Sequence, residues 1–117
     1  METVFPGFIY DLPEADIPFK GVKGWVSQSG SHQVVFMEIE AIGKVKEHSH
    51  GAQWGVVLEG EMELTIGSDT RTYIKGDRYF IPAGVVHAAD FKRKTYVIDY
   101  FNEPSRYRTK TNPSIYE

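Results

Sequence analysis

The sequence contains no cysteine among its 117 residues. This absence excludes a disulfide framework, an iron–sulfur cluster, a thiol nucleophile and a zinc knuckle. Histidine is also scarce, with four residues in the whole chain. If the protein binds a transition metal, these histidines and oxygen donors must supply the ligands.

Long hydrophobic runs are absent as well. The longest of them, such as residues 34–37, are far shorter than the ~20 residues that span a bilayer. Residues 1–4 lack the basic start and the apolar stretch of a secretory signal. We therefore expect a cytoplasmic protein that does not associate with membranes.

The chain also lacks an excess of positive charge, since its formal net charge is −3 at pH 7. This balance does not favour nucleic acid as a partner. Basic residues do gather at 92–94 and 106–110. We interpret both groups as solvated turns or tails, with a local basic patch as the alternative. The length suits a single domain.

What the sequence does contain is alternation of apolar and polar residues, the pattern of half-buried strands. It is clearest at residues 33–41 and 61–66, and the turn at 67–69 predicts a hairpin into 70–75. Many short strands separated by glycine and proline indicate an antiparallel sandwich or barrel. Further β-rich runs lie at 54–58, 78–81, 85–88 and 95–101.

The two ends differ from this central part. Residues 1–20 contain three prolines and are predicted to form an extended arm. Residues 21–101 are predicted to form a single β domain. Residues 102–117 are interpreted as a tail with a short helix at 105–109.

Three of the four histidines have a spacing that suits a metal site. His48 and His50 are two residues apart, so on a strand both imidazoles would point to one face. His87 follows a proline- and glycine-containing turn further along the chain. His32 precedes a predicted strand beside a serine, and we interpret it as a surface residue.

The surroundings of these histidines resemble the two sequence motifs of the cupin superfamily. The first motif has glycine, His-x-His, glutamate or glutamine, and glycine, and the second has glycine, Pro-x-Gly and histidine. The first is represented here by Gly43, His48, His50, Gln53 and Gly60, and the second by Gly76, Pro82, Gly84 and His87. The resemblance covers roughly residues 33–101 and implies an all-β, RmlC-like fold, an antiparallel jelly-roll β-barrel.

The resemblance also implies a metal site in the mouth of the barrel. His48, His50, Gln53 and His87 would hold one divalent transition metal such as Ni, Zn, Fe or Mn. Four neutral ligands would leave the charge of the ion uncompensated and would favour an anionic ligand. Two alternatives are that Gln53 only forms hydrogen bonds near the ion and that the barrel holds no metal.

A second group of candidate residues lies near the end of the chain. Period-2 alternation places Val97, Asp99 and Phe101 on one face, with Asp99 a candidate acid or base. Arg106 could hold a substrate carboxylate. Asp99, Phe101, Pro104 and Arg106 are similar to residues of the cupins that linearise unsaturated uronates in pectin degradation, although Arg106 falls one residue later. The alternative is that Asp99 lies on the rim and Arg106 is a tail charge.

Most aromatic side chains are expected in the core or at an interface. The alternative is that one or two of Trp25, Trp54, Tyr79 and Phe80 line the pocket and stack on a ring-shaped ligand. Tyr79 and Ile81 share a face opposite to Phe80, so only one of the two aromatics can point inward. Val34 and Phe36 interrupt the polar face of their strand. Together with the proline-rich arm they are consistent with the homodimers common among small cupins.

The leading functional hypothesis is a metal-dependent enzyme. It would catalyse isomerisation or ring-opening of a small anionic substrate, either sugar-derived or another carboxylate. One alternative is an Fe(II) dioxygenase, because three-histidine sites occur in such enzymes. The other alternative is a cupin that binds a small ligand without catalysis and uses its metal structurally.

Overall fold

Nine β-strands and one short 3₁₀ helix make up the regular structure of residues 4–110, the part described by this computed structural model. Residues 1–3 of the predicted arm and 111–117 of the predicted tail lie outside it. The elements are η1 (Gly7–Asp11), β1 (Val22–Gln28), β2 (Gln33–Ile39), β3 (Gly43–His48), β4 (Gln53–Glu59), β5 (Glu61–Ile66), β6 (Asp69–Ile74), β7 (Arg78–Ile81), β8 (His87–Phe91) and β9 (Thr95–Phe101).

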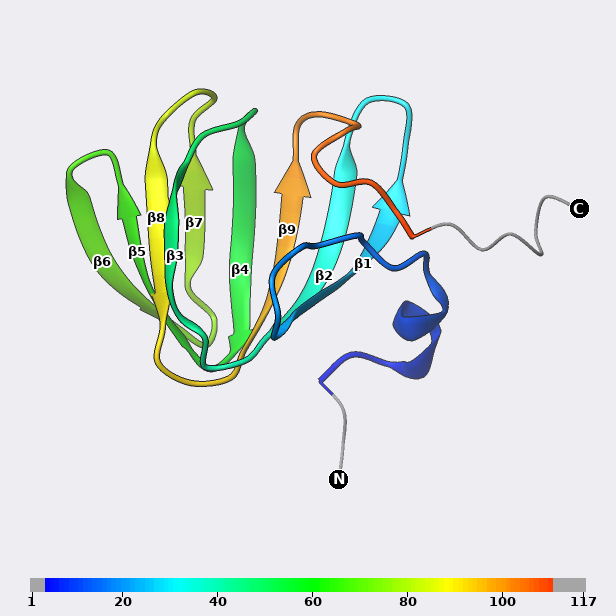
Figure 1. The fold of residues 1–117 in the computed structure, drawn as a ribbon, viewed down its shortest axis with the longest axis horizontal. Coiled ribbons are helices and arrows are strands. Elements are labelled where there is room, and N and C mark those ends of the chain that lie inside the picture. The colour runs from blue at the N-terminus through cyan, green and yellow to red at the C-terminus, as the bar shows by residue number, and fades with distance from the viewer. Residues whose placement is uncertain (1–3, 111–117) are drawn as a thin grey trace, which may run out of the picture.

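The strands form two antiparallel sheets that face each other (Figure 1). One sheet has the order β1-β2-β9-β4-β7 and the other β3-β8-β5-β6. The alternation in β2 buries Val35, Met37 and Ile39 between the sheets, as its pattern predicted. The predicted all-β jelly-roll fold is therefore confirmed.

Two strands were not predicted, and a third begins later than expected. β1 contains three consecutive buried residues, and β3 lies at a sheet edge with exposed Lys44, Lys46 and Glu47, so the sequence of neither strand alternates clearly between apolar and polar residues. β8 begins at His87 because a turn occupies the preceding residues, with the Val85 N–H donating to the Pro82 carbonyl. Gly84 has φ +77° in this turn.

The N-terminal segment packs on the outer face of the five-stranded sheet. Phe5 is 2% exposed, and its ring lies 5.7 Å from that of Phe36 and 5.8 Å from that of Tyr96. Phe5, Ile9 and Trp25 form a second apolar cluster outside the main core. This chain's own segment therefore covers Phe36, which explains an apolar residue on the outward face of β2.

The predicted helix at residues 105–109 is wrong. This stretch consists of turns and bends, and it pairs with the N-terminal segment at the bridge between Ala15 and Thr109. The Asp16 N–H donates to the Arg108 carbonyl at 2.7 Å. A helix was not formed because these backbone groups bond across the molecule and not along their own turn. The end of the described chain therefore folds back over the β-sandwich.

The rest of the outer face remains uncovered along one row of side chains. Val34, Tyr100, Trp54 and Phe80 are direct neighbours on β2, β9, β4 and β7. Trp54 is 44% exposed, Phe80 58% and Tyr100 37%. Tyr79, in contrast, points inward and is buried, so the prediction that one of the two adjacent aromatics faces the interior is confirmed.

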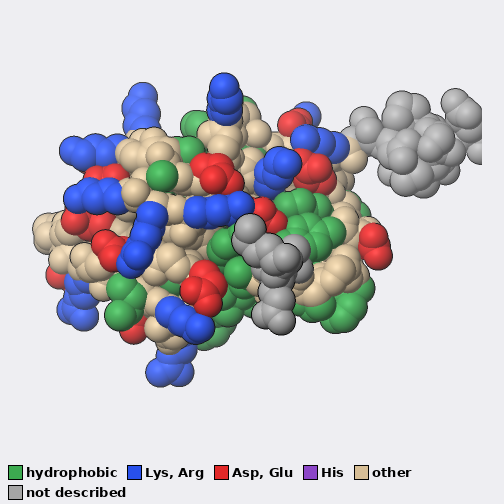
Figure 2. Space-filling view, turned by 90° about the horizontal axis from the view of Figure 1, so that it is seen from below, with side chains coloured by type: hydrophobic (Ala, Val, Ile, Leu, Met, Phe, Trp, Pro, Cys, Tyr) green, Lys and Arg blue, Asp and Glu red, His purple; other side chains and the backbone are tan. Residues whose placement is uncertain are grey.

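The surface seen from below carries interspersed basic and acidic side chains (Figure 2). Hydrophobic side chains gather toward the side where β1 and the N-terminal segment lie in Figure 1. Within residues 4–110, no helix is both long and apolar enough to cross a membrane.

Candidate metal centre

Three of the four histidines meet at one end of the β-sandwich, the upper end in Figure 1. His48 is the last residue of β3 and lies opposite His87, the first residue of β8. His50 follows in the loop before β4, and its carbonyl accepts a hydrogen bond from Gly84 at 2.8 Å. This bond brings the loop beside the turn that precedes His87.

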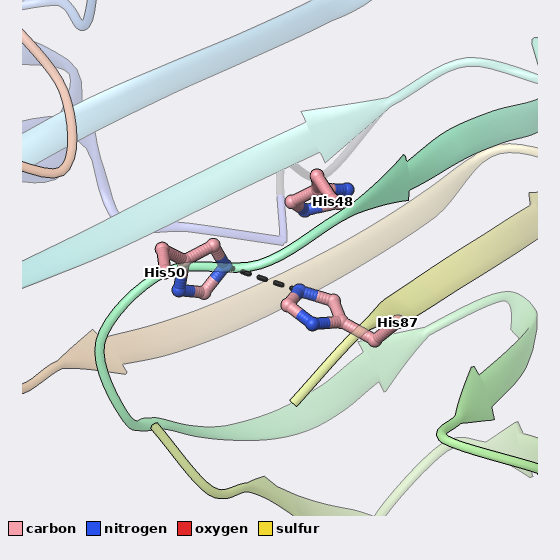
Figure 3. A group of neighbouring side chains, drawn as sticks. All are labelled: His48, His50 and His87. Carbon is pink, nitrogen blue, oxygen red and sulfur yellow. Dashed lines mark hydrogen bonds between the residues drawn. The ribbon is translucent and has the colours of Figure 1, made fainter. Parts of the chain in front are cut away.

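The three imidazoles point toward one another (Figure 3). One ring nitrogen from each histidine lies within 4.8 Å of the others. The shortest approach joins Nε2 of His50 to Nε2 of His87 at 3.1 Å. The sequence prediction assumed that a strand would align His48 and His50, whereas a loop positions the second of them.

Backbone carbonyl groups determine which nitrogen of each ring carries hydrogen. Nδ1 of His48 lies 2.9 Å from the carbonyl oxygen of Lys46, and Nδ1 of His50 lies 2.8 Å from that of Gly51. Nδ1 of His87 lies 2.9 Å from the carbonyl oxygen of Val85. Because a carbonyl only accepts hydrogen bonds, each Nδ1 donates and each Nε2 presents its lone pair.

This arrangement fits a divalent transition metal. With hydrogen on Nδ1 in both rings, the Nε2 atoms of His50 and His87 have no proton to share at 3.1 Å. A cation between them would satisfy both lone pairs. Two nitrogens that each lie ~2.0–2.1 Å from one metal are roughly 2.8–3.4 Å apart at octahedral or tetrahedral angles. The observed separation falls in that range.

The histidines are also kept in the neutral form that binds metals. Burial lowers the pKa of His50 to about 4, against its hydrogen bond to Gly51, and the nearby Arg106 charge lowers it further. Burial likewise lowers the pKa of His87. Neither imidazole therefore requires deprotonation at neutral pH before it can bind a metal ion.

Gln53 begins β4 and is buried at the same end of the sandwich. Its side chain lines the cavity with the three histidines and makes a polar contact with Asp99 that lowers the pKa of that carboxyl group. This contact is consistent with the hydrogen-bonding role that was considered for Gln53. A direct bond from its amide oxygen to the metal stays a prediction.

Asp99 lies inside the cavity and not on the rim, with 4% of the residue exposed. The Tyr79 hydroxyl donates a hydrogen bond of 2.5 Å to Asp99 Oδ1. Burial raises the pKa of Asp99 to about 6, although hydrogen bonds from Tyr79 and Gln53 and the charge of Arg106 oppose this rise. The carboxyl group can therefore change its protonation state near neutral pH.

Gly55 makes the contact between Tyr79 and Asp99 possible. It lies on β4 directly between Asp99 on β9 and Tyr79 on β7. A Cβ atom at Gly55 would overlap both the carboxylate and the tyrosine ring. The tyrosine side chain thus reaches across β4 through the space that the missing side chain leaves.

Arg106 also lines the cavity, although it belongs to the segment predicted as a tail. Its guanidinium carbon lies 4.3 Å from the centre of the Tyr107 ring and 5.6 Å from that of Phe101. Its Nε is buried without a hydrogen-bond partner among the described residues. The two rings hold the cation in place and leave a buried N–H available to an anion.

The cavity itself has a volume of about 620 Å³, within the range of small-molecule sites. Polar groups gather at its metal-binding end, whereas its inner wall is apolar. The polar lining includes His48, His50, Gln53, Tyr79, His87, Asp99 and Arg106, together with Asp16, Lys46, Glu47, Ser49 and Arg108, and the apolar wall includes Met37, Ile39, Met62, Leu64 and Val97. All candidate site residues from the sequence therefore face one cavity.

His32 is separate from this cavity and half-buried at the surface. Its ring stacks on Tyr100 with centres 4.8 Å apart. Its Nδ1 forms hydrogen bonds with the hydroxyl groups of Ser29 and Ser31. The structure therefore places the fourth histidine on the outer side of the sheet.

Sequence reasoning missed Tyr107 as a residue of the site and did not connect Tyr79 with Asp99. Tyr79 is one of the four aromatic residues for which the sequence leaves a place in the wall of the pocket as the alternative to the core. The alternation around Ile81 gave its direction, but nothing in the sequence linked it to Asp99, 20 residues away. Tyr107 adjoins Arg106, and that adjacency was the available signal.

Residues 34–97 match the protein family described as Cupin domain. No curated protein matches the chain. Similar solved structures include an RmlC-like cupin from Shewanella frigidimarina NCIMB 400, with a TM-score of 0.72 and 24% identity over 91% of this chain and 94% of that chain.

KdgF from Halomonas sp. is similar at a TM-score of 0.71 and 21% identity, covering 91% of this chain and 96% of that chain. An oxalate decarboxylase from Bacillus subtilis gives a TM-score of 0.68 at 15% identity, covering 88% of this chain but 30% of that chain. These likenesses support the fold.

Proposed function

This chain belongs to the Cupin domain family, and from its three-histidine centre we propose that it is a metal-dependent enzyme for a small anionic substrate. One observation carries the proposal. The unprotonated Nε2 atoms converge in the same cavity that contains a buried carboxyl group and a guanidinium with a free N–H.

His48, His50 and His87 would hold the metal, with Gln53 as a fourth ligand. A bound divalent ion would act as a Lewis acid that polarises a carbonyl or hydroxyl oxygen of the substrate. Because all four ligands are neutral, they would leave the positive charge of the site uncompensated. The site would therefore favour an anionic group.

Arg106 would bind and orient the substrate through its carboxylate. Its cation is fixed over Phe101 and Tyr107, so little conformational freedom is lost when an anion binds. Asp99 would take a proton from one substrate atom and return it to another. Its pKa of about 6 suits this exchange, because both protonation states are accessible near neutral pH.

These roles suit isomerisation or ring-opening of a sugar-derived carboxylate. Structural similarity to KdgF from Halomonas sp. is consistent with a sugar-related substrate. We expect the protein loaded with Ni, Zn, Fe or Mn to convert an unsaturated uronate, with the product followed by NMR. Protein treated with a chelator should be inactive. If the protein does not convert the unsaturated uronate with any of these four metals, the proposal is contradicted.

An Fe(II) dioxygenase is a second candidate, because the three clustered ligands are histidines without a carboxylate. It predicts oxygen uptake by the iron-loaded protein and none by the zinc-loaded protein.

Non-enzymatic ligand binding is the third candidate. It predicts that the metal-loaded protein binds an anionic ligand but turns over neither an unsaturated uronate nor oxygen.

We further propose that the protein forms a homodimer through the row formed by the half-buried Val34 and the exposed Tyr100, Trp54 and Phe80. Three neighbouring aromatic side chains are exposed on this sheet face, and contiguous exposed apolar groups favour association between proteins. Light scattering is expected to give twice the chain mass for the natural protein. The double variant Trp54→Lys, Phe80→Lys is expected to give a folded monomer. A monomeric natural protein at micromolar concentration would contradict the dimer.

A further inference from the structure

The loop that carries His50 is tied to the residues that follow β9. The Asn102 N–H donates to the Ala52 carbonyl at 2.9 Å. The Gly51 N–H donates to Oε2 of Glu103 at 2.7 Å. Both contacts join segments about 50 residues apart, so the loop is held from outside and not only by its own turn.

The Glu103 contact leads directly to a metal-binding ring. Gly51 uses its N–H for the Glu103 carboxylate and its carbonyl for Nδ1 of His50, at 2.8 Å. A carboxylate acceptor makes a stronger bond to an N–H than a neutral acceptor does. A Cβ atom at Gly51 would overlap the Glu103 carboxylate, so a side chain there would require the carboxylate to move away from the Gly51 N–H. The peptide and the acid therefore fit closely.

His50 needs such support more than the other two histidines do. His48 ends β3 and His87 begins β8, so hydrogen-bonded strands fix their backbones. Their Nδ1 atoms bond to carbonyl groups of Lys46 and Val85, each two residues earlier in the same segment. His50 lies in a loop, and the carbonyl that orients its ring belongs to the residue anchored by Glu103.

We propose that Glu103 is a positioning residue of the metal centre. Its carboxylate fixes Gly51, and Gly51 fixes the His50 imidazole with Nε2 directed at His87. The proposal rests on the metal site proposed above and adds to it a residue that does not contact the ion. Outer groups that orient a ligand typically account for 10–100-fold in metal affinity.

The test is a competitive Zn²⁺ titration against a chelator with the full chain. Glu103→Ala is expected to weaken Zn²⁺ binding about 10–100-fold. Glu103→Gln keeps a side-chain carbonyl as acceptor and is expected to recover most of that loss. Glu59→Ala is the control, since it removes an exposed carboxylate paired with Lys75 and should bind Zn²⁺ as the natural protein does.

A second readout separates orientation of the ligand from general destabilisation. The visible absorption of bound Co²⁺ reports the ligand geometry, and it is expected to change in Glu103→Ala but not in Glu59→Ala or Glu103→Gln. Circular dichroism establishes that each variant is folded. If Glu103→Ala does not fold, Glu103→Gln still tests the proposal, because its affinity and Co²⁺ spectrum should remain close to those of the natural protein.

The outcomes distinguish this inference from the proposed metal site. If the natural protein binds Zn²⁺ and Glu103→Ala binds it equally well, the positioning role is overturned and the metal site stands. If Glu103→Gln loses as much affinity as Glu103→Ala, charge and not the hydrogen-bond anchor is responsible, which also overturns the role. If the natural protein binds no Zn²⁺, the metal site itself fails.

Discussion

Replacing His87 by alanine is expected to lower the affinity of the protein for Zn²⁺ or Ni²⁺ by more than about 100-fold. Groups that merely orient a ligand account for up to roughly that factor, so a direct ligand should exceed it. His87 is 4% exposed and lies 3.1 Å from the facing nitrogen of His50. No other histidine is close enough to replace it, since the fourth stacks on Tyr100 outside the cavity.

His32→Ala is the matched control for this prediction. It removes an imidazole from the same chain but leaves the cavity unchanged, so its affinity for both metals should equal that of the natural protein. Isothermal titration calorimetry measures the affinity of the natural protein, His87→Ala and His32→Ala for each metal. Equal loss of affinity in His32→Ala and His87→Ala would indicate non-specific binding and would contradict the assignment.

Asp99→Asn is expected to lower turnover of the uronate by at least about 100-fold while it raises the stability of the metal-free protein at pH 8. The activity should fall because asparagine cannot accept and return a proton, a contribution that is typically 10²–10⁴-fold. The stability should rise because the native protein buries a carboxylate in a largely apolar cavity.

The pH dependence of the stability gained by Asp99→Asn follows from the direction in which burial shifts the pKa of Asp99. Burial raises the pKa of Asp99 from 3.8 to about 6, so the folded protein holds a proton that the unfolded chain releases. The stability that this protonation contributes is present below pH 4 and lost as the pH rises through 6. The loss of this contribution above pH 6 lowers the free energy of unfolding by roughly 3 kcal/mol.

Urea unfolding of both proteins with EDTA at pH 4 and at pH 8 measures this difference. The asparagine variant should be the more stable of the two at pH 8, with a smaller advantage at pH 4. Asp99→Asn should bind Zn²⁺ as tightly as the natural protein does, and this affinity is the control for damage to the metal site. Full turnover by Asp99→Asn, or a loss of stability at pH 8, would contradict the role given to Asp99.

Much of the fold could be predicted because its signals are local. The alternation in residues 33–39 specifies an inner and an outer face, and the turn at Gly67 specifies a hairpin. Two short sequence motifs likewise predicted that His48 and His87 lie at one end of the domain. Alternation also indicated that Asp99 shares a face with Phe101.

The rest of the site depends on contacts that no local pattern contains. Tyr79 meets Asp99 only because β7 and β9 flank Gly55 on β4. Glu103 meets Gly51 across 52 residues of sequence. Alternation tells which face of a strand a residue occupies but not which strands become its neighbours.

The two ends of the chain illustrate the same limit. The proline-rich N-terminal segment was expected to be extended, and it also contains η1 and covers the outer sheet face through Phe5. The residues after β9 were expected to include a helix. Instead they pair with the N-terminal segment near Ala15, and this pairing brings Arg106 to the cavity.

Anomalous X-ray scattering from crystals of the metal-loaded protein tests the central claim most directly. Data collected on both sides of the metal's absorption edge locate and identify the ion. The structure predicts one strong peak bonded to the Nε2 atoms of His48, His50 and His87. A map without a peak among these three histidines, or with the ion bound through their Nδ1 atoms, would contradict the account.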